Sequence, residues 1–207
     1  MIKEVYGILT REFGELEWWP AGSAFERVVG AILVQQTRWE SVEKVLAVLD
    51  KKGLLTPKTM GFVSLEELEE LVRPAGFHRQ KARYLKGVAS YFSDRPEKEL
   101  FSLPADLLHR ELLSLDGIGK ETADAIMLYA ADRQRFVLDA YAKRMFGCLG
   151  LKGGYGQIQE KFADALGTDL HAHRQCHALI VEHGKRYCSR KRCGECAVAR
   201  YRAGEKL

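Results

Sequence analysis

Three cysteines near the carboxyl end of the chain have a spacing typical of metal ligands. They form the pattern Cys188-x4-Cys193-x2-Cys196, which places three thiols within nine residues. The chain has five cysteines, an odd number, and it opens without the basic start and apolar stretch of a secretory signal. In such a chain, crowded cysteines favour a metal or cluster site over disulfides. The sequence therefore predicts a site held by thiolates in this segment.

Two closely spaced glycines form a tight turn between two predicted helices. The segment runs Gly117-Ile118-Gly119-Lys120, with Thr122 in the first turn of the second helix. Glycines permit a positive φ and leave the turn bare of side chains. Backbone N–H groups of the turn and of the next helix can then approach a phosphate, which positions a nucleic acid without reading its sequence. We expect a phosphate contact from these five residues.

The longer pattern Leu-x-Gly-Ile-Gly-Lys-x-Thr-Ala, residues 115–123, resembles the helix–hairpin–helix DNA glycosylases of the endonuclease III superfamily. Two further segments carry the resemblance, which spans about residues 18–196. Residues 32–37, Ile-Leu-Val-Gln-Gln-Thr, are similar to the family's glutamine-bearing helix end, and residues 76–82, Gly-Phe-His-Arg-Gln-Lys-Ala, to its Gly-aromatic-x-x-Lys-Ala loop. The resemblance implies an all-α fold of two lobes with a DNA-binding cleft between them.

Asp139 stands about twenty residues after the hairpin, where the family has its catalytic aspartate. Cleavage of a glycosidic bond builds positive charge on the sugar. A carboxylate beside the sugar stabilises that charge and can orient or deprotonate the attacking water. Taken alone, Asp139 would more often be a helix cap or an ion-pair partner. Its position after the hairpin favours the catalytic role.

The resemblance also implies which residues fill the gap that a flipped base leaves behind. A base must leave the stack before a protein can reach it, at a cost of a few kcal/mol. The family's gap-filling glutamine corresponds to Gln36, and its probe of the opposite strand corresponds to Phe77. The alternatives are a helix C-cap for Gln36 and a core aromatic for Phe77.

Members of the family that also nick the strand carry a lysine two residues after the second hairpin glycine. This lysine attacks the sugar and forms a Schiff base. Here that position holds Glu121, and Lys120 lies one residue earlier, about 100° round the helix. The departure predicts an enzyme that uses water and has no lyase activity.

Tryptophans flank the segments that carry the resemblance. Trp18-Trp19-Pro20 precedes the first long predicted helix, and Trp39 follows the glutamine loop. An electron-poor cationic base stacks well on indole, at about 1–3 kcal/mol per base. The pattern is most similar to the 3-methyladenine glycosylase branch, which implies a base pocket of Trp19 and Trp39 with Trp18, Pro20 and Lys185 beside them. The alternatives are tryptophans that seal the seam between lobes, and a lysine that contacts phosphate or solvent.

For the cysteines, the resemblance implies a [4Fe–4S] cluster, which four thiolates with x6, x2 and x5 spacing hold in many relatives. This chain shortens the first gap and has Arg202 in the fourth position. Cys176 lies twelve residues before Cys188, roughly 18 Å away along a helix. Three interpretations stay open: a cluster with an unusual fourth ligand, a structural zinc completed by histidine or water, or no metal. Base excision itself needs no cofactor.

Helical periodicity dominates the chain, and we expect an all-α fold. Predicted capping boxes, Ser23 with Glu26 and Ser64 with Glu67, begin two of the helices. We expect a helical bundle over 23–130 that ends in the hairpin. A second lobe would join 1–22 to 131–207 and carry Asp139 and the basic, cysteine-rich end.

Charge is concentrated at the carboxyl end. The net charge is +4, but residues 171–207 hold nine Lys and Arg against three Glu. This distribution favours a phosphate-facing surface over a merely solvated tail. The sequence contains no run of 18 apolar residues, the length needed to span a membrane. We expect a monomer that acts on double-stranded DNA containing a damaged base, in the cytoplasm of a bacterium or archaeon, at the nucleoid.

These observations predict a monofunctional DNA glycosylase acting on an alkylated base similar to 3-methyladenine. Two enzymatic alternatives are a bifunctional endonuclease III-type glycosylase and lyase, and a mismatch thymine or uracil glycosylase. A third alternative is a DNA-structure-binding module that kept the hairpin and lost catalysis.

Overall fold

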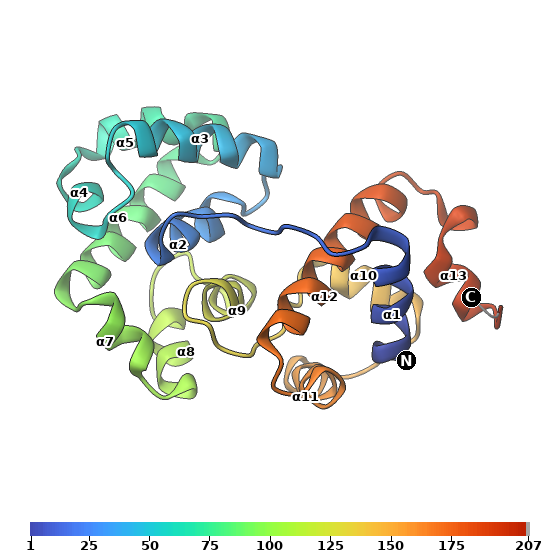
Figure 1. Ribbon diagram of the computed structural model, residues 1–207. Coiled ribbons are helices and arrows are strands. Elements are labelled where there is room, and N and C mark those ends of the chain that lie inside the picture. Colours follow the sequence, from blue (N-terminus) through green and yellow to red (C-terminus); the bar gives the residue numbers. More distant parts are fainter. Residues whose placement is uncertain (206–207) are drawn as a thin grey trace. The chain divides into compact units, whose positions relative to one another are not determined.

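The computed structural model describes residues 1–205, which contain helices and no β-strand (Figure 1). The predicted all-α class is confirmed. Lys206, counted above in the basic segment, lies outside the described residues. Among the helices of residues 1–205, none has the length and apolar character needed to cross a membrane.

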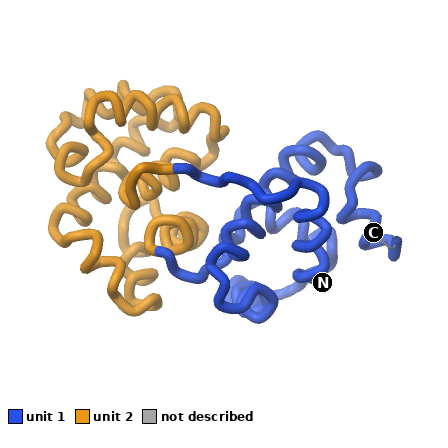
Figure 2. Tube along the Cα trace, viewed as in Figure 1, with its two compact units in different colours: residues 1–20, 132–207 blue, residues 21–131 orange. Residues whose placement is uncertain are grey.

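The described residues form two compact units, coloured separately in Figure 2. Unit 2 is the continuous segment 21–131, and unit 1 joins residues 1–20 to 132–207. The sequence predicts boundaries at 22/23 and 130/131, and the compact units divide at 20/21 and 131/132.

Unit 2 contains eight α-helices and one short 3₁₀-helix. They are α2 (Ala24–Leu33), α3 (Trp39–Lys51), α4 (Pro57–Phe62), α5 (Leu65–Val72), η1 (Arg73–Ala75), α6 (His78–Asp94), α7 (Glu97–Ser102), α8 (Ala105–Leu113) and α9 (Lys120–Tyr129). Helix α9 packs against α2 and α8, and every residue from Thr122 to Tyr129 is buried. The second hairpin helix is thus the centre of this unit, so the turn before it starts from a rigid support.

Unit 1 brings the amino-terminal helix onto the carboxyl-terminal ones. Its elements are α1 (Ile2–Phe13), α10 (Ala140–Cys148), α11 (Tyr155–Leu166), α12 (Leu170–His183), η2 (Gly184–Cys188, a π-helical turn), η3 (Cys193–Glu195) and α13 (Ala197–Arg202). Phe136 and Phe162 stack at its core, with ring centroids 3.4 Å apart and planes at 6°. Phe136 belongs to the extended segment that leads to α10, so this stack fixes the approach to Asp139.

The two predicted capping boxes form only in part. Ser23 Oγ accepts the Glu26 N–H at 3.1 Å, but the Glu26 carboxylate accepts from the Gly22 N–H at 2.7 Å. Ser64 Oγ likewise accepts the Glu67 N–H, whereas the Glu67 carboxylate pairs with Lys52. The serine half depends only on local backbone geometry. The glutamate half competes with other donors, here a neighbouring N–H and an ammonium from another helix.

A contact between a histidine and a buried carboxylate joins the two helices of the hairpin. His109 Nε2 of α8 lies 3.0 Å from Asp124 Oδ1 of α9, and the Asp124 side chain is fully buried. A buried carboxylate that loses a partner is costly, so this contact should contribute strongly to the stability of the hairpin.

We predict that His109→Leu lowers the free energy of unfolding by about 3 kcal/mol, because it removes a partner from the buried Asp124 carboxylate. Urea unfolding followed by circular dichroism measures the change. The control is Arg79→Ala, since Arg79 is 80% exposed and its pairing with Glu69 spans 3.9 Å; it should change stability by less than about 0.5 kcal/mol. Equal effects of the two substitutions would contradict the prediction.

Candidate active site and DNA-contacting hairpin

The hairpin turn requires glycine at its first position. Gly117 has φ +82°, and a Cβ there would lie 2.2 Å from Cδ2 of Tyr84, whose ring from α6 packs against the turn. Gly119 has an extended backbone and is the N-cap of α9, and a Cβ added there would meet nothing within 4 Å. Ile118 is buried and Lys120 is exposed. The turn is therefore anchored on one side and bare on the other, as a phosphate contact requires.

Gln35 holds the hairpin to the end of α2. Its Nε2 donates to the Gly117 carbonyl at 2.8 Å and to Thr122 Oγ1 at 3.1 Å. Sequence reasoning expected phosphate contact from Thr122 and gave no role to Gln35. Thr122 is in fact buried against Gln35, so its hydroxyl supports the turn from within. The adjacent residues Gln35 and Gln36 are the only signal in the sequence for this contact. The sequence does not indicate which of the two side chains points inward.

The two wedge candidates lie on loops with left-handed backbones. Gln36 has φ 53° and is exposed, and Phe77 has φ 47° with 58% of its surface exposed. The C-cap of α2 is Val34, so Gln36 is not that cap. Phe77 is not a core aromatic. Positive φ is unfavourable for residues other than glycine and often marks functional loops. Both side chains are therefore exposed by a left-handed backbone conformation that is energetically unfavourable.

One buried lysine ties these two loops together. Lys81 Nζ donates to the Leu33 and Ala75 carbonyls, both at 2.8 Å, and to Thr37 Oγ1 at 3.0 Å. Thr37 Oγ1 in turn donates to the Ala75 carbonyl. Burial lowers the pKa of Lys81 to about 8, so the group is still mainly an ammonium at neutral pH. Three acceptors around it fix the two loops side by side.

Asp139 begins helix α10. Oδ1 accepts the Ala142 N–H at 2.7 Å as the N-cap, and the side chain is 15% exposed. The preceding segment is held because the Gln159 side chain bonds the backbone of Phe136, whose N–H donates to Gln159 Oε1 at 2.9 Å. The helix-cap interpretation is thus correct for one oxygen. The orientation of the carboxylate is fixed by the same bond.

A histidine that sequence reasoning missed stands behind Asp139. His177 Nε2 on α12 lies 3.7 Å from Asp139 Oδ2. Trp18 meets the His177 ring edge-on, with centroids 6.2 Å apart and planes at 89°. Lys185 Nζ lies 5.5 Å from the centre of the Trp18 ring. These four residues come from four segments of unit 1. Residues 175–181 of α12 are all buried, so the sequence gives no periodic signal that singles out His177.

Gly184 permits the close approach that brings these segments together. A Cβ at Gly184 would lie 2.2 Å from Cδ1 of Tyr141, in the first turn of α10. The π-helical turn η2 starts at this glycine and carries Lys185. π-Helical turns are rare and are frequent at functional sites.

The other pocket candidates are divided between the units. Trp19 is half-buried with φ 54°, and Pro20 is exposed; both belong to unit 1. Trp39 begins α3 in unit 2, and its Nε1 donates to Glu43 Oε1 at 2.9 Å. The structure therefore groups Trp18 and Lys185 with Asp139 in unit 1, whereas Trp39 belongs to unit 2.

The three predicted metal ligands lie in consecutive short elements. Cys188 ends η2, Cys193 begins η3, and Cys196 is the N-cap of α13. Within residues 1–205, no three His, Cys, Asp or Glu side chains gather tightly enough to hold a single metal ion. Among the basic residues nearby, Arg192 pairs with Glu195 and Arg200 with Glu205.

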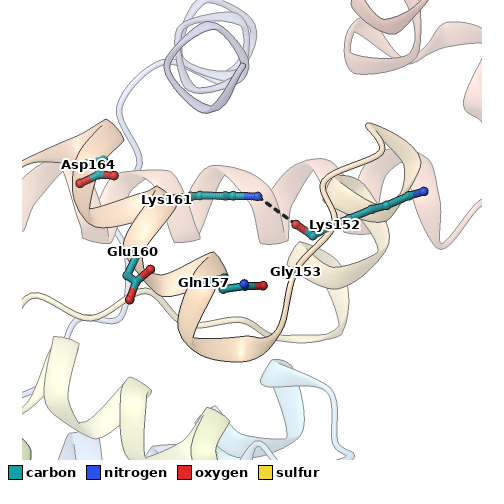
Figure 3. A pocket seen from close by; sticks show the side chains of 6 residues that line it. All are labelled: Lys152, Gly153, Gln157, Glu160, Lys161 and Asp164. Carbon is teal, nitrogen blue, oxygen red and sulfur yellow. Dashed lines mark hydrogen bonds between the residues drawn. The ribbon is translucent and has the colours of Figure 1, made fainter.

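A polar depression of about 550 Å³ lies elsewhere in unit 1 (Figure 3). Lys161 Nζ donates to the Lys152 carbonyl at its edge, at 2.9 Å. Its lining also includes Gly153, Gln157, Glu160 and Asp164. None of these residues belongs to the Asp139 constellation, and the lining has no aromatic ring on which a base could stack, so we do not assign the chemistry to this depression.

Comparison with known proteins shows the family to which the chain belongs. Residues 29–189 match the family described as HhH-GPD superfamily base excision DNA repair protein. A Methanocaldococcus jannaschii protein with the provisional name DNA repair glycosylase MJ1434 is 43% identical over 97% of this chain and 95% of its own length. Endonuclease III of Sulfolobus acidocaldarius is 26% identical over 86% of this chain and 81% of its own.

Among solved structures, the 3-methyladenine DNA glycosylase MagIII of H. pylori, bound to 1,N6-ethenoadenine, is similar with a TM-score of 0.76 and 27% identity. The match covers 89% of this chain and 97% of that one.

We predict that Gly119→Ala weakens binding to duplex DNA at least tenfold while the free energy of unfolding changes by less than about 1 kcal/mol. The added methyl group meets no protein atom but would stand between the backbone N–H groups and a phosphate. Fluorescence anisotropy with a labelled duplex measures affinity. Gly117→Ala is the contrasting variant, because its methyl group clashes with Tyr84 and should destabilise the fold as well. Unchanged affinity in Gly119→Ala would exclude the turn as a DNA contact.

Proposed function

Because this chain belongs to the HhH-GPD superfamily of base excision DNA repair proteins, we propose that it is a monofunctional DNA glycosylase that releases an alkylated base by hydrolysis. Its activity as a DNA glycosylase of base excision repair follows from the family and its relatives. The hydrolytic mechanism and the alkylated substrate are the proposed part. The observation that carries the mechanism is the Asp139 carboxylate, oriented by its own helix and backed by His177.

The carboxylate is preorganised for the charge that develops on the sugar. Oδ1 is engaged by the Ala142 N–H, so the side chain cannot rotate without breaking the cap. A fixed anion stabilises a cationic transition state without reorganising when the reaction occurs. Water adds to C1′ as the bond from C1′ to the base breaks, and the bonding electrons leave with the base. Asp139 Oδ2 takes the proton that the water releases.

His177 is suited to position the second oxygen. Its Nε2 lies 3.7 Å from Oδ2, so the buried imidazole ring occupies the space beside that oxygen. The ring thereby limits the orientations of Oδ2. His177 thus acts through Asp139 in this mechanism and is a positioning residue.

Hydrolysis is favoured over lyase chemistry by the residue at the position of the lyase lysine. Glu121 lies in the first turn of α9, is exposed, and offers no amine for a Schiff base. Lys120 is its neighbour in the chain and projects from the helix about 100° away. Water is then the nucleophile that the site provides.

Two observations support an alkylated base. The Trp18 ring already accepts a cation on its face, the Lys185 ammonium, which is how an indole would attract a positively charged methylated base. Such a base also leaves easily, since bond cleavage neutralises its charge. The reaction therefore depends more on a carboxylate that stabilises the charge on the sugar than on a general acid that protonates the base. The similarity to MagIII agrees with this substrate class.

We predict that Asp139→Asn lowers the rate of base release by about 10²–10³-fold while DNA affinity and stability stay near the wild-type values. Asparagine is as good an N-cap as aspartate, so α10 should still form. Asp169→Asn is the matched control, because Asp169 caps α12 by the same bond, to the Ala172 N–H at 3.1 Å. Single-turnover release from a lesion-bearing duplex provides the rates. Equal rates for the two variants would remove Asp139 from the chemistry.

We predict that borohydride traps no covalent complex with wild-type protein, and that release is fastest from a duplex with 3-methyladenine. The panel should also contain uracil and thymine opposite guanine and an oxidised pyrimidine. A trapped complex would show an amine nucleophile and overturn the hydrolytic mechanism. Faster release of uracil, thymine or the oxidised base would overturn the alkylated substrate alone. DNA binding with no release of any base would mark a binding module.

A further inference from the structure

A segment without regular secondary structure carries Trp18 to the Asp139 constellation of unit 1. Helix α1 ends at Phe13, and Gly14 after it has φ +71° and turns the chain. Residues 14–21 form neither a helix nor a strand. The backbone groups of such a segment have no regular partners of their own, so other parts of the fold must bond and hold them.

The side chain of Gln175 holds this segment at Leu16. The Leu16 N–H donates to Gln175 Oε1 at 3.0 Å, and Gln175 Nε2 donates to the Leu16 carbonyl at 2.7 Å. The two bonds satisfy both backbone groups of Leu16, as a neighbouring β-strand would. Gln175 belongs to α12 and is only 7% exposed. Because the contact is bidentate, it fixes the orientation of the main chain at Leu16 as well as its position.

Contacts on either side of Leu16 show that the segment follows α12 in the same direction. Glu15 Oε1 lies 3.2 Å from His171 Nε2, and Trp18 meets the His177 ring edge-on. The chain from Glu15 to Trp18 spans about 10 Å if it is extended. The helix from His171 to His177 rises about 9 Å. Since the two lengths match, a bond at Leu16 determines where Trp18 lies along α12.

Among these contacts, the one made by Gln175 acts most directly on the main chain before Trp18. The pair of Glu15 and His171 is exposed, with side chains 74% and 61% accessible, and exposed pairs contribute little. The contact between Trp18 and His177 joins two side chains and leaves the main chain unbonded. The bonds of Gln175 hold the backbone itself, two residues before the indole.

Unit 1 uses the same arrangement on the segment that leads to Asp139. There the Gln159 side chain bonds both the N–H and the carbonyl of Phe136, three residues before the carboxylate. Gln175 makes the equivalent pair of bonds two residues before Trp18. Each glutamine replaces a neighbouring strand beside an irregular segment, and each segment delivers one residue of the candidate site.

We propose that Gln175 is a positioning residue for the flipped base, because it holds the segment from which Trp18 extends to His177. The inference rests on the proposed function, in which the Trp18 ring stacks on the base. Gln175 itself touches no reacting atom. Loss of its two bonds should weaken base binding and leave the Asp139 carboxylate in place, since the Ala142 N–H caps that group separately.

A fluorine label tests the positioning without any substrate. Full-length protein labelled with 5-fluorotryptophan contains three tryptophans, and Trp18→Phe assigns the fluorine resonance of Trp18. Gln175→Met keeps the length of the side chain and removes both bonds, so it should shift or broaden that resonance. Gln157→Met is the matched control, because Gln157 also bonds a backbone N–H, that of Gly154 at 2.9 Å, outside the Asp139 constellation. An unchanged Trp18 resonance in Gln175→Met would overturn the proposal.

Single-turnover kinetics test the effect on the base. The substrate is whichever lesion of the duplex panel the wild-type protein releases fastest, so the substrate class does not affect the comparison. Gln175→Met should raise the half-saturating concentration about tenfold, as expected when one base–aromatic stack is disturbed. The rate at saturation should change less than about twofold, and Gln157→Met should match the wild type. A lower rate at saturation with an unchanged half-saturation would overturn the proposal, since Gln175 would then act on the carboxylate.

A conservative replacement separates the two bonds from the volume of the side chain. In Gln175→Glu, a protonated carboxyl can accept the Leu16 N–H and donate to the Leu16 carbonyl, whereas a carboxylate cannot donate. Burial raises the pKa of a carboxyl, so lowering the pH should bring the half-saturation of this variant to the wild-type value. A half-saturation that equals that of Gln175→Met at every pH would overturn the proposal.

These readouts distinguish the positioning role from the proposed function and from folding. Base release by the wild type at a half-saturation that Gln175→Met leaves unchanged would overturn the positioning role alone. A wild type that releases no base would overturn the proposed function, and the Trp18 resonance would then decide whether Gln175 holds the indole. Circular dichroism verifies that the variants keep their helices. If Gln175→Met does not fold, the pH series of Gln175→Glu provides the same test.

Discussion

The hydrogen bond from the Ala142 N–H to Asp139 Oδ1 gives one carboxylate two tasks. It begins helix α10, and it orients the group that would face the sugar. The surrounding structure serves this bond: the Phe136 stack and the Gln159 side chain fix the chain before it, and α12 brings His177 behind the second oxygen. A helix cap requires only one suitable residue in the sequence. It is also rigid, since the helix that follows resists rotation of its first side chain.

The two loops that carry Gln36 and Phe77 also depend on a single group. A single ammonium, Lys81, satisfies acceptors from two loops at once. Its three bonds offset the cost of burying the charge. They also hold the left-handed backbones that display Gln36 and Phe77. Two exposed side chains on separate loops are thereby positioned by one buried group.

The helices, the hairpin and the position of Asp139 could be predicted, because each depends on a pattern of residues close together in the sequence. Apolar periodicity defines α2 and α6, two glycines define the turn, and Asp139 follows at a fixed interval. The contacts of His177 and Gln35 were not found, because each of these residues meets its partner from an element distant in sequence. The half-formed capping boxes show the same limit. At the start of a helix, a serine oxygen accepts the backbone N–H three residues later, and this bond needs only local geometry. The Glu67 carboxylate instead pairs with Lys52, which only the packing of the helices brings near.

The order of the units along the chain has a consequence for synthesis. Unit 2 is one continuous segment, whereas unit 1 is assembled from both ends. Unit 2 can therefore fold while the ribosome is still making the rest. Helix α1 packs against α11, α12 and α13, so its apolar face, with Val5 and Leu9, has no complete partner until the last helices emerge. In the nascent protein the apolar face of α1 thus stays exposed until α11, α12 and α13 have been made, a period in which a chaperone could bind it.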